Sequence, residues 1–183
     1  MMSTDSGKKM LGEERREWIL KLLKDSGNPI TGGILAKNTN VSRQVIVGDI
    51  TLLKARDEPI IATSQGYMYM PIPEDKKRFE KTIACFHQRD QAEEELNIIV
   101  DLGVTVKDVK VEHPVYGDLT ASIMVSNRQE VQAFLGQIAN TNAALLSDLT
   151  SGFHLHTLTA TNEKAILKAE QHLKSAGILI EEN

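Results

Sequence analysis

Two histidines separated by one residue stand in residues 153–157, which read Phe-His-Leu-His-Thr. Polar and apolar side chains alternate from His154 to Thr159, and this alternation predicts a β-strand. Residues two apart in a strand point to the same face, with Cα atoms roughly 6.5–7 Å apart. His154 and His156 are therefore expected to project side by side, as two imidazoles that bind one metal ion must.

A third histidine, His87, stands where a predicted strand meets a predicted acidic helix. That helix offers several carboxylates, and the spacing alone does not choose among Asp90, Glu94 and Glu95 as the partner of His87. Two or three imidazoles with one carboxylate suit a borderline divalent metal such as zinc, iron, nickel or manganese. The alternative for each histidine taken singly is a hydrogen-bonded core position or a surface position.

The composition indicates a soluble globular protein. The chain has 183 residues, 41% of them hydrophobic and 25% charged, which fits one domain or two small ones. Basic residues are in slight excess over residues 1–73 and acidic residues over residues 74–183, so two domains with different partners are expected. No apolar run approaches the ~18 residues of a membrane-spanning helix, and the polar N-terminus is no secretory signal. We therefore expect a cytoplasmic protein that does not bind a membrane.

The single cysteine, Cys85, excludes a disulfide within the chain and favours a reducing compartment. It lies in the apolar run Thr-Ile-Ala-Cys-Phe. The sequence predicts that Cys85 is a small buried hydrophobic residue.

The front third of the chain has the order of elements of a winged helix-turn-helix. An amphipathic pattern predicts a helix over residues 11–25. Thr31 can cap a second, short helix that must end at the polar turn of residues 38–40. A third helix is expected over residues 43–55, followed by two β-like runs that a hairpin turn connects.

Residues 31–53 closely resemble the winged helix-turn-helix family of DNA-binding domains. A recognition helix needs a polar first turn that enters the major groove and an apolar back that holds it. The predicted contacts to double-stranded DNA come from the start and the outer face of the third helix: Ser42, Arg43, Gln44, Val47 and Thr51. A protein-interaction module of the same fold is the alternative.

Two features of this module bear on how it would bind an operator. Gly48 lies within the third helix, where glycine costs roughly 0.5–1 kcal/mol relative to alanine. It either allows a close approach of the DNA backbone or is simply tolerated. The wing turn at residues 64–66 carries no lysine or arginine, so one copy should bind weakly. Because a second copy doubles the phosphate contacts, a homodimer is expected.

Two prolines and a charge run at residues 71–78 mark a domain boundary. The sequence predicts a disordered tail over residues 1–10, a winged helix-turn-helix over 11–72 and a second domain over 73–183. The second domain is expected to be α+β, an open βαββαβα sandwich with a mainly antiparallel sheet and helices on one face. Its strands are expected over residues 79–86, 104–113, 119–125 and 153–158, with a possible short one at 178–180, and its helices over 90–102, 128–139 and 163–175.

Three further segments resemble the three-histidine domain of the nicotinate-responsive repressors of bacterial NAD synthesis and niacin uptake genes. These segments are residues 86–96, 111–119 and 152–157. The resemblance implies a cytoplasmic, homodimeric DNA-binding repressor with nicotinic acid as its co-repressor. It also implies a metal set, which comprises His87, Glu95, His154 and His156. His113 matches another motif of that domain, and we assign it an effector contact as a hypothesis.

Two other classes of function compete with a repressor. A metal-dependent hydrolase or transferase is one, but the sequence has no nucleophile elbow, P-loop or His-Glu-x-x-His motif, and four protein ligands leave little room for an activated water. An adaptor that binds protein instead of DNA is the other. We therefore predict a protein that is not an enzyme. Nicotinamide and nucleotide derivatives remain possible effectors, since the resemblance alone favours nicotinate.

Overall fold

The computed structural model describes residues 10–70 and 78–181. The tail expected over residues 1–10 lies outside the described residues except for Met10, and residues 71–77 of the linker lie outside them too. The chain forms two compact units, Met1–Glu74 and Asp75–Asn183. Within the described residues, no helix is both long enough and apolar enough to cross a lipid bilayer.

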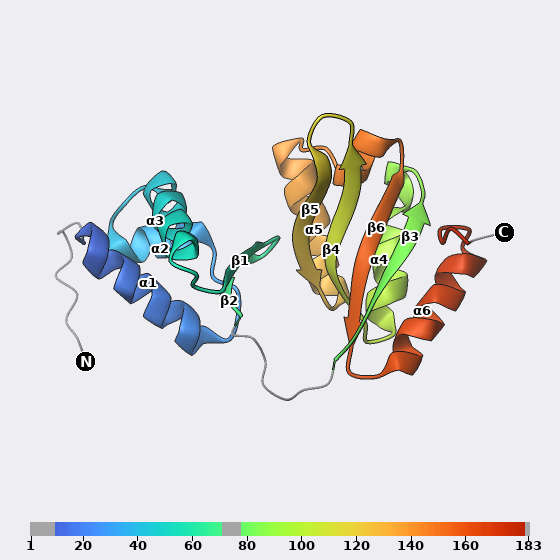
Figure 1. Ribbon diagram of the computed structural model, residues 1–183, viewed down its shortest axis with the longest axis horizontal. Helices are drawn as coiled ribbons and strands as arrows, with labels where there is room; N and C mark the ends of the chain where they lie inside the picture. Colours follow the sequence, from blue (N-terminus) through green and yellow to red (C-terminus); the bar gives the residue numbers. More distant parts are fainter. Residues whose placement is uncertain (1–9, 71–77, 182–183) are drawn as a thin grey trace. The chain divides into compact units, whose positions relative to one another are not determined.

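The first unit is a winged helix-turn-helix, as the sequence predicts (Figure 1). Thr31 and Ser42 cap the second and third helices, because their hydroxyl oxygens accept the backbone N–H groups of Ile34 and Val45. Asn40 closes the turn between these helices in the left-handed conformation, with a φ of 53°. The elements are α1 (Gly12–Ser26), α2 (Gly32–Thr39), α3 (Arg43–Ala55), β1 (Ile60–Thr63) and β2 (Gly66–Tyr69).

A buried ion pair joins α1 to the recognition helix α3. Arg15 donates from Nε to Asp49 Oδ2 at 2.5 Å, and Arg16 adds a contact at 3.2 Å to the other oxygen of Asp49. Arg15 and Asp49 are both buried. Removing one partner of such a pair costs about 3–5 kcal/mol, so this pair fixes how α3 lies on α1.

The second unit has the predicted βαββαβα order and one four-stranded antiparallel sheet in the order β3-β6-β4-β5 (Figure 1). The two His-x-His residues lie on β6, in the interior of this sheet. The elements are β3 (Phe79–Phe86), α4 (Ala92–Asp101), β4 (Thr105–His113), β5 (Gly117–Val125), α5 (Arg128–Thr141), β6 (Phe153–Ala160) and α6 (Glu163–Ser175).

One face of the sheet packs against the helices and the other is open. Alternate strand residues such as Ile83, Val106 and Leu158 are buried with Ile99 of α4 and Leu173 of α6 in one apolar core. The open face carries the intervening side chains. The expected sandwich with helices on one face is therefore confirmed.

The structure differs from the predicted elements at three places. A 3₁₀ turn, η1 (Arg89–Gln91), replaces the first turn of the helix expected over residues 90–102. A second 3₁₀ helix, η2 (Leu146–Thr150), lies where no element was expected, since a turn this short has no hydrophobic period. The strand expected at residues 178–180 is reduced to one bridge between Cys85 and Leu179.

Candidate functional site

The side chains of His154 and His156 project from β6 toward the helices, on the face that also carries buried Leu158 and Ala160. The two imidazole rings lie side by side, with centroids 4.8 Å apart. They are 5% and 3% exposed, so neither is a surface histidine. The alternation in the sequence thus gave the correct orientation of this pair.

His87 and Glu95 reach the same place from the segment that follows β3. Glu95 shares the buried face of α4 with Ala92, Leu96 and Ile99, and this face points toward the sheet. Glu95 is 2% exposed, whereas Asp90 and Glu94 are exposed. The structure therefore selects the one carboxylate among those that the spacing had left open.

The three imidazoles converge on this single carboxylate. Glu95 Oε2 lies 2.7 Å from His87 Nε2, 3.2 Å from His156 Nε2 and 3.3 Å from His154 Nε2. His154 Nε2 also lies 3.2 Å from Glu95 Oε1. Three ring nitrogens, two from β6 and one from the segment after β3, thus meet one buried oxygen.

The opposite ring nitrogen of each histidine is occupied by a backbone carbonyl. His87 Nδ1 lies 2.7 Å from the carbonyl oxygen of Gln88, His154 Nδ1 lies 2.9 Å from that of Gly152, and His156 Nδ1 lies 2.7 Å from that of Asp108. Because a carbonyl oxygen only accepts, each Nδ1 carries the proton. Each Nε2 is then the atom left for the shared partner, which is the arrangement that orients metal-binding histidines.

Gly152 is required for this arrangement. Its carbonyl oxygen accepts both the His154 Nδ1–H and, at 3.4 Å, the backbone N–H of His87. Its φ is 104°, and a Cβ atom there would lie 2.4 Å from the carbonyl oxygen of His87. Only glycine allows these two segments to approach so closely.

The charged forms of Glu95, His87 and His156 stabilise one another, as the directions of their pKa shifts show. Burial acts to raise the pKa of Glu95, but the charge of His156 and hydrogen bonds from all three imidazoles hold that pKa well below its usual value. Burial acts to lower the pKa of His87 and His156, and the Glu95 carboxylate overcomes it, so both pKa values are raised. The cluster therefore favours a carboxylate surrounded by positive charge.

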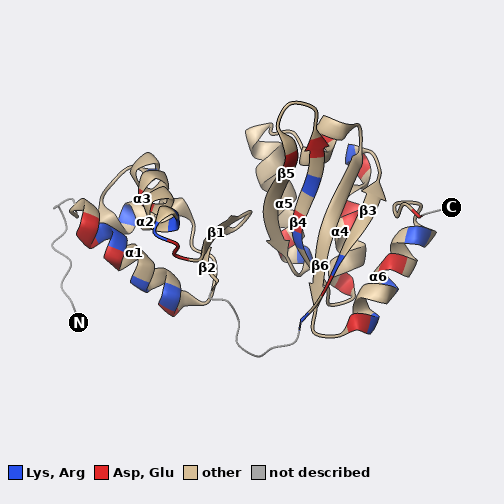
Figure 2. Cartoon of the chain, in the orientation of Figure 1, with Lys and Arg blue, Asp and Glu red and all other residues tan. Residues whose placement is uncertain are grey.

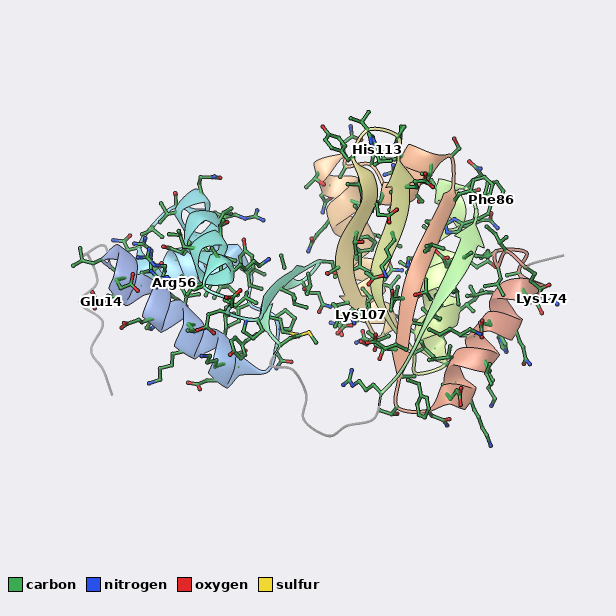
Figure 3. The ribbon with its side chains drawn as sticks, in the orientation of Figure 1. Glu14, Arg56, Phe86, Lys107, His113 and Lys174 are labelled. Carbon is green, nitrogen blue, oxygen red and sulfur yellow. The ribbon has the colours of Figure 1, made fainter. Side chains whose placement is uncertain are left out.

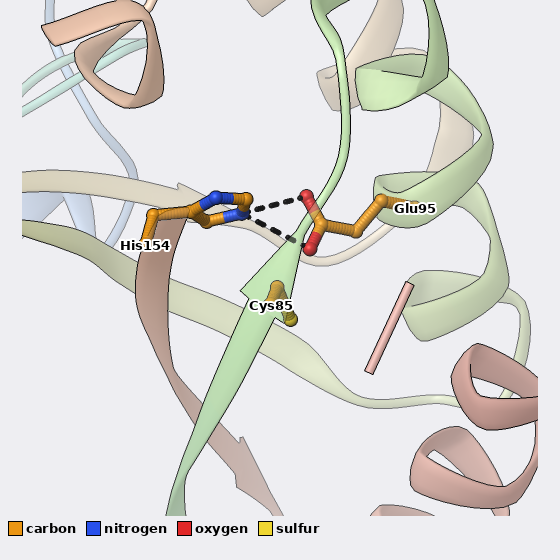
Figure 4. Close-up of side chains that lie close together, drawn as sticks. All are labelled: Cys85, Glu95 and His154. Atoms are coloured by element: carbon orange, nitrogen blue, oxygen red, sulfur yellow. Dashed lines mark hydrogen bonds and ion pairs between the residues drawn. The ribbon is translucent and has the colours of Figure 1, made fainter. Parts of the chain in front are cut away.

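Cys85 lies next to the cluster, on β3 directly opposite His154 of β6 (Figure 4). Its Sγ atom and the ligand atoms of Glu95 and His154 all lie within 4.8 Å of one another. The residue is fully buried, as the sequence predicts, and burial raises the pKa of its thiol. The sequence gave no sign of its position beside the histidines, which follows from the sheet order.

The donor set fits a divalent transition metal. It offers three imidazole nitrogens and one carboxylate, all of them buried and close together, and backbone carbonyls orient the three imidazoles. A metal ion bound in place of the protons between these groups would contact the same three Nε2 atoms and the Glu95 carboxylate.

A cavity of about 190 Å³ opens beside the cluster. His87, Glu95, His154 and His156 line one part of it, and Ser147 is the remaining polar lining side chain among the described residues. Apolar side chains from β4, β5 and α5 and from the segment before β6 make the other walls, among them Val109, Ile123, Phe134, Ile138 and Leu145. A few polar groups in a mostly apolar cavity are typical of a small-molecule site.

His113 lies apart from this site, at the end of β4 in the β4–β5 hairpin (Figure 3). Its Nδ1 accepts the backbone N–H groups of Val115 and Tyr116 at 3.1 and 3.2 Å. It is not among the residues that line the cavity. These contacts give His113 a part in the hairpin turn, and its effector contact stays a hypothesis.

The outer face of α3 carries the predicted DNA contacts. Ser42, Arg43, Gln44, Val47 and Thr51 are all exposed, while Ile46, Asp49, Ile50 and Leu53 are buried behind them. The Ser42 hydroxyl is the N-cap of the helix and the Thr51 hydroxyl donates to the Val47 carbonyl oxygen. Basic and acidic side chains are mixed along α1, so the module carries no continuous basic surface there (Figure 2).

A helix-turn-helix module followed by an α+β domain with a buried histidine cluster is the architecture of a DNA-binding regulator with a second, separate domain. Comparison with known protein families gives the same two domains. Residues 15–68 match the HTH domain family and residues 80–182 match the 3H domain family.

Two relatives extend over nearly the whole chain. The transcription repressor NadR of Bacillus subtilis is 59% identical over 175 residues, which are 95% of this chain and 97% of that protein. The probable transcription repressor NiaR of Thermotoga maritima is 37% identical over 174 residues, 95% of this chain and 98% of that protein. The chain belongs to this family of 3H-domain transcription repressors, which are not enzymes.

Proposed function

We propose that this chain is a cytoplasmic repressor of genes for NAD synthesis or niacin uptake, with nicotinic acid as its co-repressor. Residues 11–72 bind a double-stranded DNA operator in a homodimer, and residues 73–183 bind a divalent metal and the co-repressor. The names of the two relatives, and the order of a helix-turn-helix domain followed by a 3H domain, support the regulatory role.

The convergence of three Nε2 atoms on Glu95 is the observation that supports a metal-dependent sensor. His87, Glu95, His154 and His156 would hold the ion, since each imidazole is oriented by a backbone carbonyl at Nδ1 and its Nε2 atom meets the Glu95 carboxylate. A divalent ion with three neutral imidazoles and one carboxylate keeps one net positive charge, which attracts an anionic ligand. The chain's own part is to orient the imidazoles and to exclude water from them.

The size and lining of the cavity favour a single aromatic ring with a carboxylate. At about 190 Å³ the cavity is smaller than the roughly 300–1,000 Å³ of drug-sized sites, so a dinucleotide would not fit inside it. Phe134 and the aliphatic residues around it suit an apolar ring, and the cluster suits an acid group. Nicotinic acid has both parts, whereas nicotinamide lacks the charge.

The surface of α3 supports DNA binding. Arg43 and Gln44 are exposed at the helix start, where side chains reach phosphates and base edges. Val47 and Thr51 extend the same face and can meet thymine methyl groups. Because α3 adds few basic residues, two copies on two half-sites are needed for a tight complex, and ligand binding would favour the arrangement of the two copies that fits the operator.

A gel-shift titration with the promoter of a niacin-related gene tests this proposal. We expect nicotinate to tighten the complex of the metal-loaded protein, and the double variant His154→Ala/His156→Ala to lose that response while it retains its nicotinate-independent DNA binding. His172→Ala removes an exposed imidazole from α6 and should behave as the unmodified protein. An unchanged nicotinate response in the double variant would contradict the proposal.

A further inference from the structure

Among the residues that the structure describes, none is a hydrogen-bond partner of the Ser147 side chain. Ser147 lies in η2, is 7% exposed and lines the cavity beside the histidine cluster. No hydrogen bond joins its Oγ atom to another of the described residues. Because Ser147 lines a largely apolar cavity, its hydroxyl is available to a ligand that enters there.

The backbone around Ser147 is fixed, which gives its hydroxyl a defined place. The Ser147 carbonyl oxygen accepts the N–H of Gly152 at 2.9 Å and the hydroxyl of Thr150 at 3.2 Å. Asp148 accepts the N–H of Leu145 at 2.8 Å and the guanidinium of Arg89 at 2.9 Å. Ser147 is therefore held in a clamped turn, and a ligand would not have to order it.

Ser147 and the histidine cluster line the same cavity, and the remaining walls are apolar. Ser147 lies close to the cluster, since its carbonyl oxygen accepts the N–H of Gly152, whose own carbonyl oxygen accepts the His154 Nδ1–H. A ring held at the cluster by its acid group would therefore lie within reach of Ser147.

We propose that Ser147 determines the specificity of this site, by donating a hydrogen bond to an acceptor atom in the ring of an aromatic acid. This inference rests on the proposed function and names which acids the site accepts. A pyridine nitrogen accepts such a bond. The C–H group at that position of a benzene ring does not, and it leaves the buried hydroxyl unpaired.

The test compares nicotinate with benzoate, which has the same shape and charge but no ring acceptor. Calorimetric titrations are made with metal-loaded protein and with the variant Ser147→Ala. We expect the unmodified protein to bind nicotinate about three- to tenfold more tightly than benzoate, the usual worth of one neutral hydrogen bond. Ser147→Ala should bind both acids with equal affinity.

Ser122→Ala is the matched control, because Ser122 lies on β5 between Ala121 and Ile123 of the cavity wall and so points to the open face. It should keep the full preference for nicotinate. A Ser147→Ala variant that keeps the preference, or that loses affinity for both acids alike, would overturn the inference. Failure of the unmodified protein to bind either acid would instead contradict the proposed function.

Discussion

Replacing Glu95 by glutamine removes the charge at the centre of the cluster and leaves its shape almost unchanged. The carboxylate is 2% exposed and three imidazole Nε2 atoms lie within 3.3 Å of one of its oxygens. In the metal-free protein, a protonated imidazole beside Glu95 is a buried ion pair. Removal of one partner of such a pair costs about 3–5 kcal/mol of the free energy of unfolding.

The pH at which this cost appears follows from the pKa shifts. The pKa values of His87 and His156 are raised from 6.5, so the stability they contribute is full below pH 6.5 and is lost as the pH rises through their folded values. The pKa of Glu95 is lowered from 4.5, so its contribution is full above pH 4.5 and is lost as the pH falls through its folded value. The ion pairs therefore contribute most between pH 4.5 and 6.5.

Calorimetric unfolding of the metal-free protein at about pH 6 and pH 9 measures this effect. Glu95→Gln should lower the stability of the second unit by about 3–5 kcal/mol at the lower pH and by clearly less at the higher pH. The sole tryptophan, Trp18, packs in the first unit, so its fluorescence follows that unit separately and should not change. Glu94→Gln alters an exposed neighbour and is the control.

Glu95→Gln should also lose most of the stabilisation against unfolding that bound metal provides. Excess zinc or nickel at 1,000 times its dissociation constant would stabilise the unmodified protein by about 4 kcal/mol and Glu95→Gln by much less. A Glu95→Gln protein that matches the unmodified one at pH 6, or whose deficit grows with pH, would refute the reasoning about charge. Equal stabilisation of both proteins by metal would refute the assignment of Glu95 as a ligand.

Three further substitutions test separate parts of the structure. Gly48→Ala places a Cβ atom that meets nothing within 4 Å, so thermal unfolding should show a gain of about 0.5–1 kcal/mol. A gel shift should at the same time show weaker operator binding, and unchanged affinity would mean that Gly48 is simply tolerated. Gly152→Ala should lower stability by more than about 1 kcal/mol and reduce bound metal on elemental analysis, because its Cβ atom would meet the His87 carbonyl oxygen; normal metal content would contradict this. Cys85→Ser should retain metal, and the cobalt-loaded unmodified protein should lack a thiolate charge-transfer band, whose presence would make Cys85 a ligand.

Many elements of both units follow from the sequence because their signals are local. The His-Leu-His alternation alone predicted the strand and its paired imidazoles, and the capping residues Thr31 and Ser42 marked two helix starts. The choice of Glu95 came from the family resemblance, because the spacing from His87 left three carboxylates open; in the structure Glu95 shares the apolar face of α4 with Ala92 and Ile99.

Features that depend on contacts between distant segments were not predictable. The place of Cys85 opposite His154 depends on β3 pairing with β6, and a single sequence does not specify that strand order. Ser147 reads as an ordinary loop residue, and only the fold brings it to the cavity. The Arg15–Asp49 pair joins helices 34 residues apart in the chain for the same reason.

Titration of nicotinate into metal-loaded and metal-stripped protein, with nicotinamide as the uncharged comparison, tests the central claim most directly. The account predicts that nicotinate binds the loaded protein, that stripping the metal abolishes binding, and that nicotinamide binds much more weakly. Equal binding of nicotinate to the stripped protein, or equal binding of nicotinamide to the loaded protein, would contradict a metal-held site for an aromatic acid.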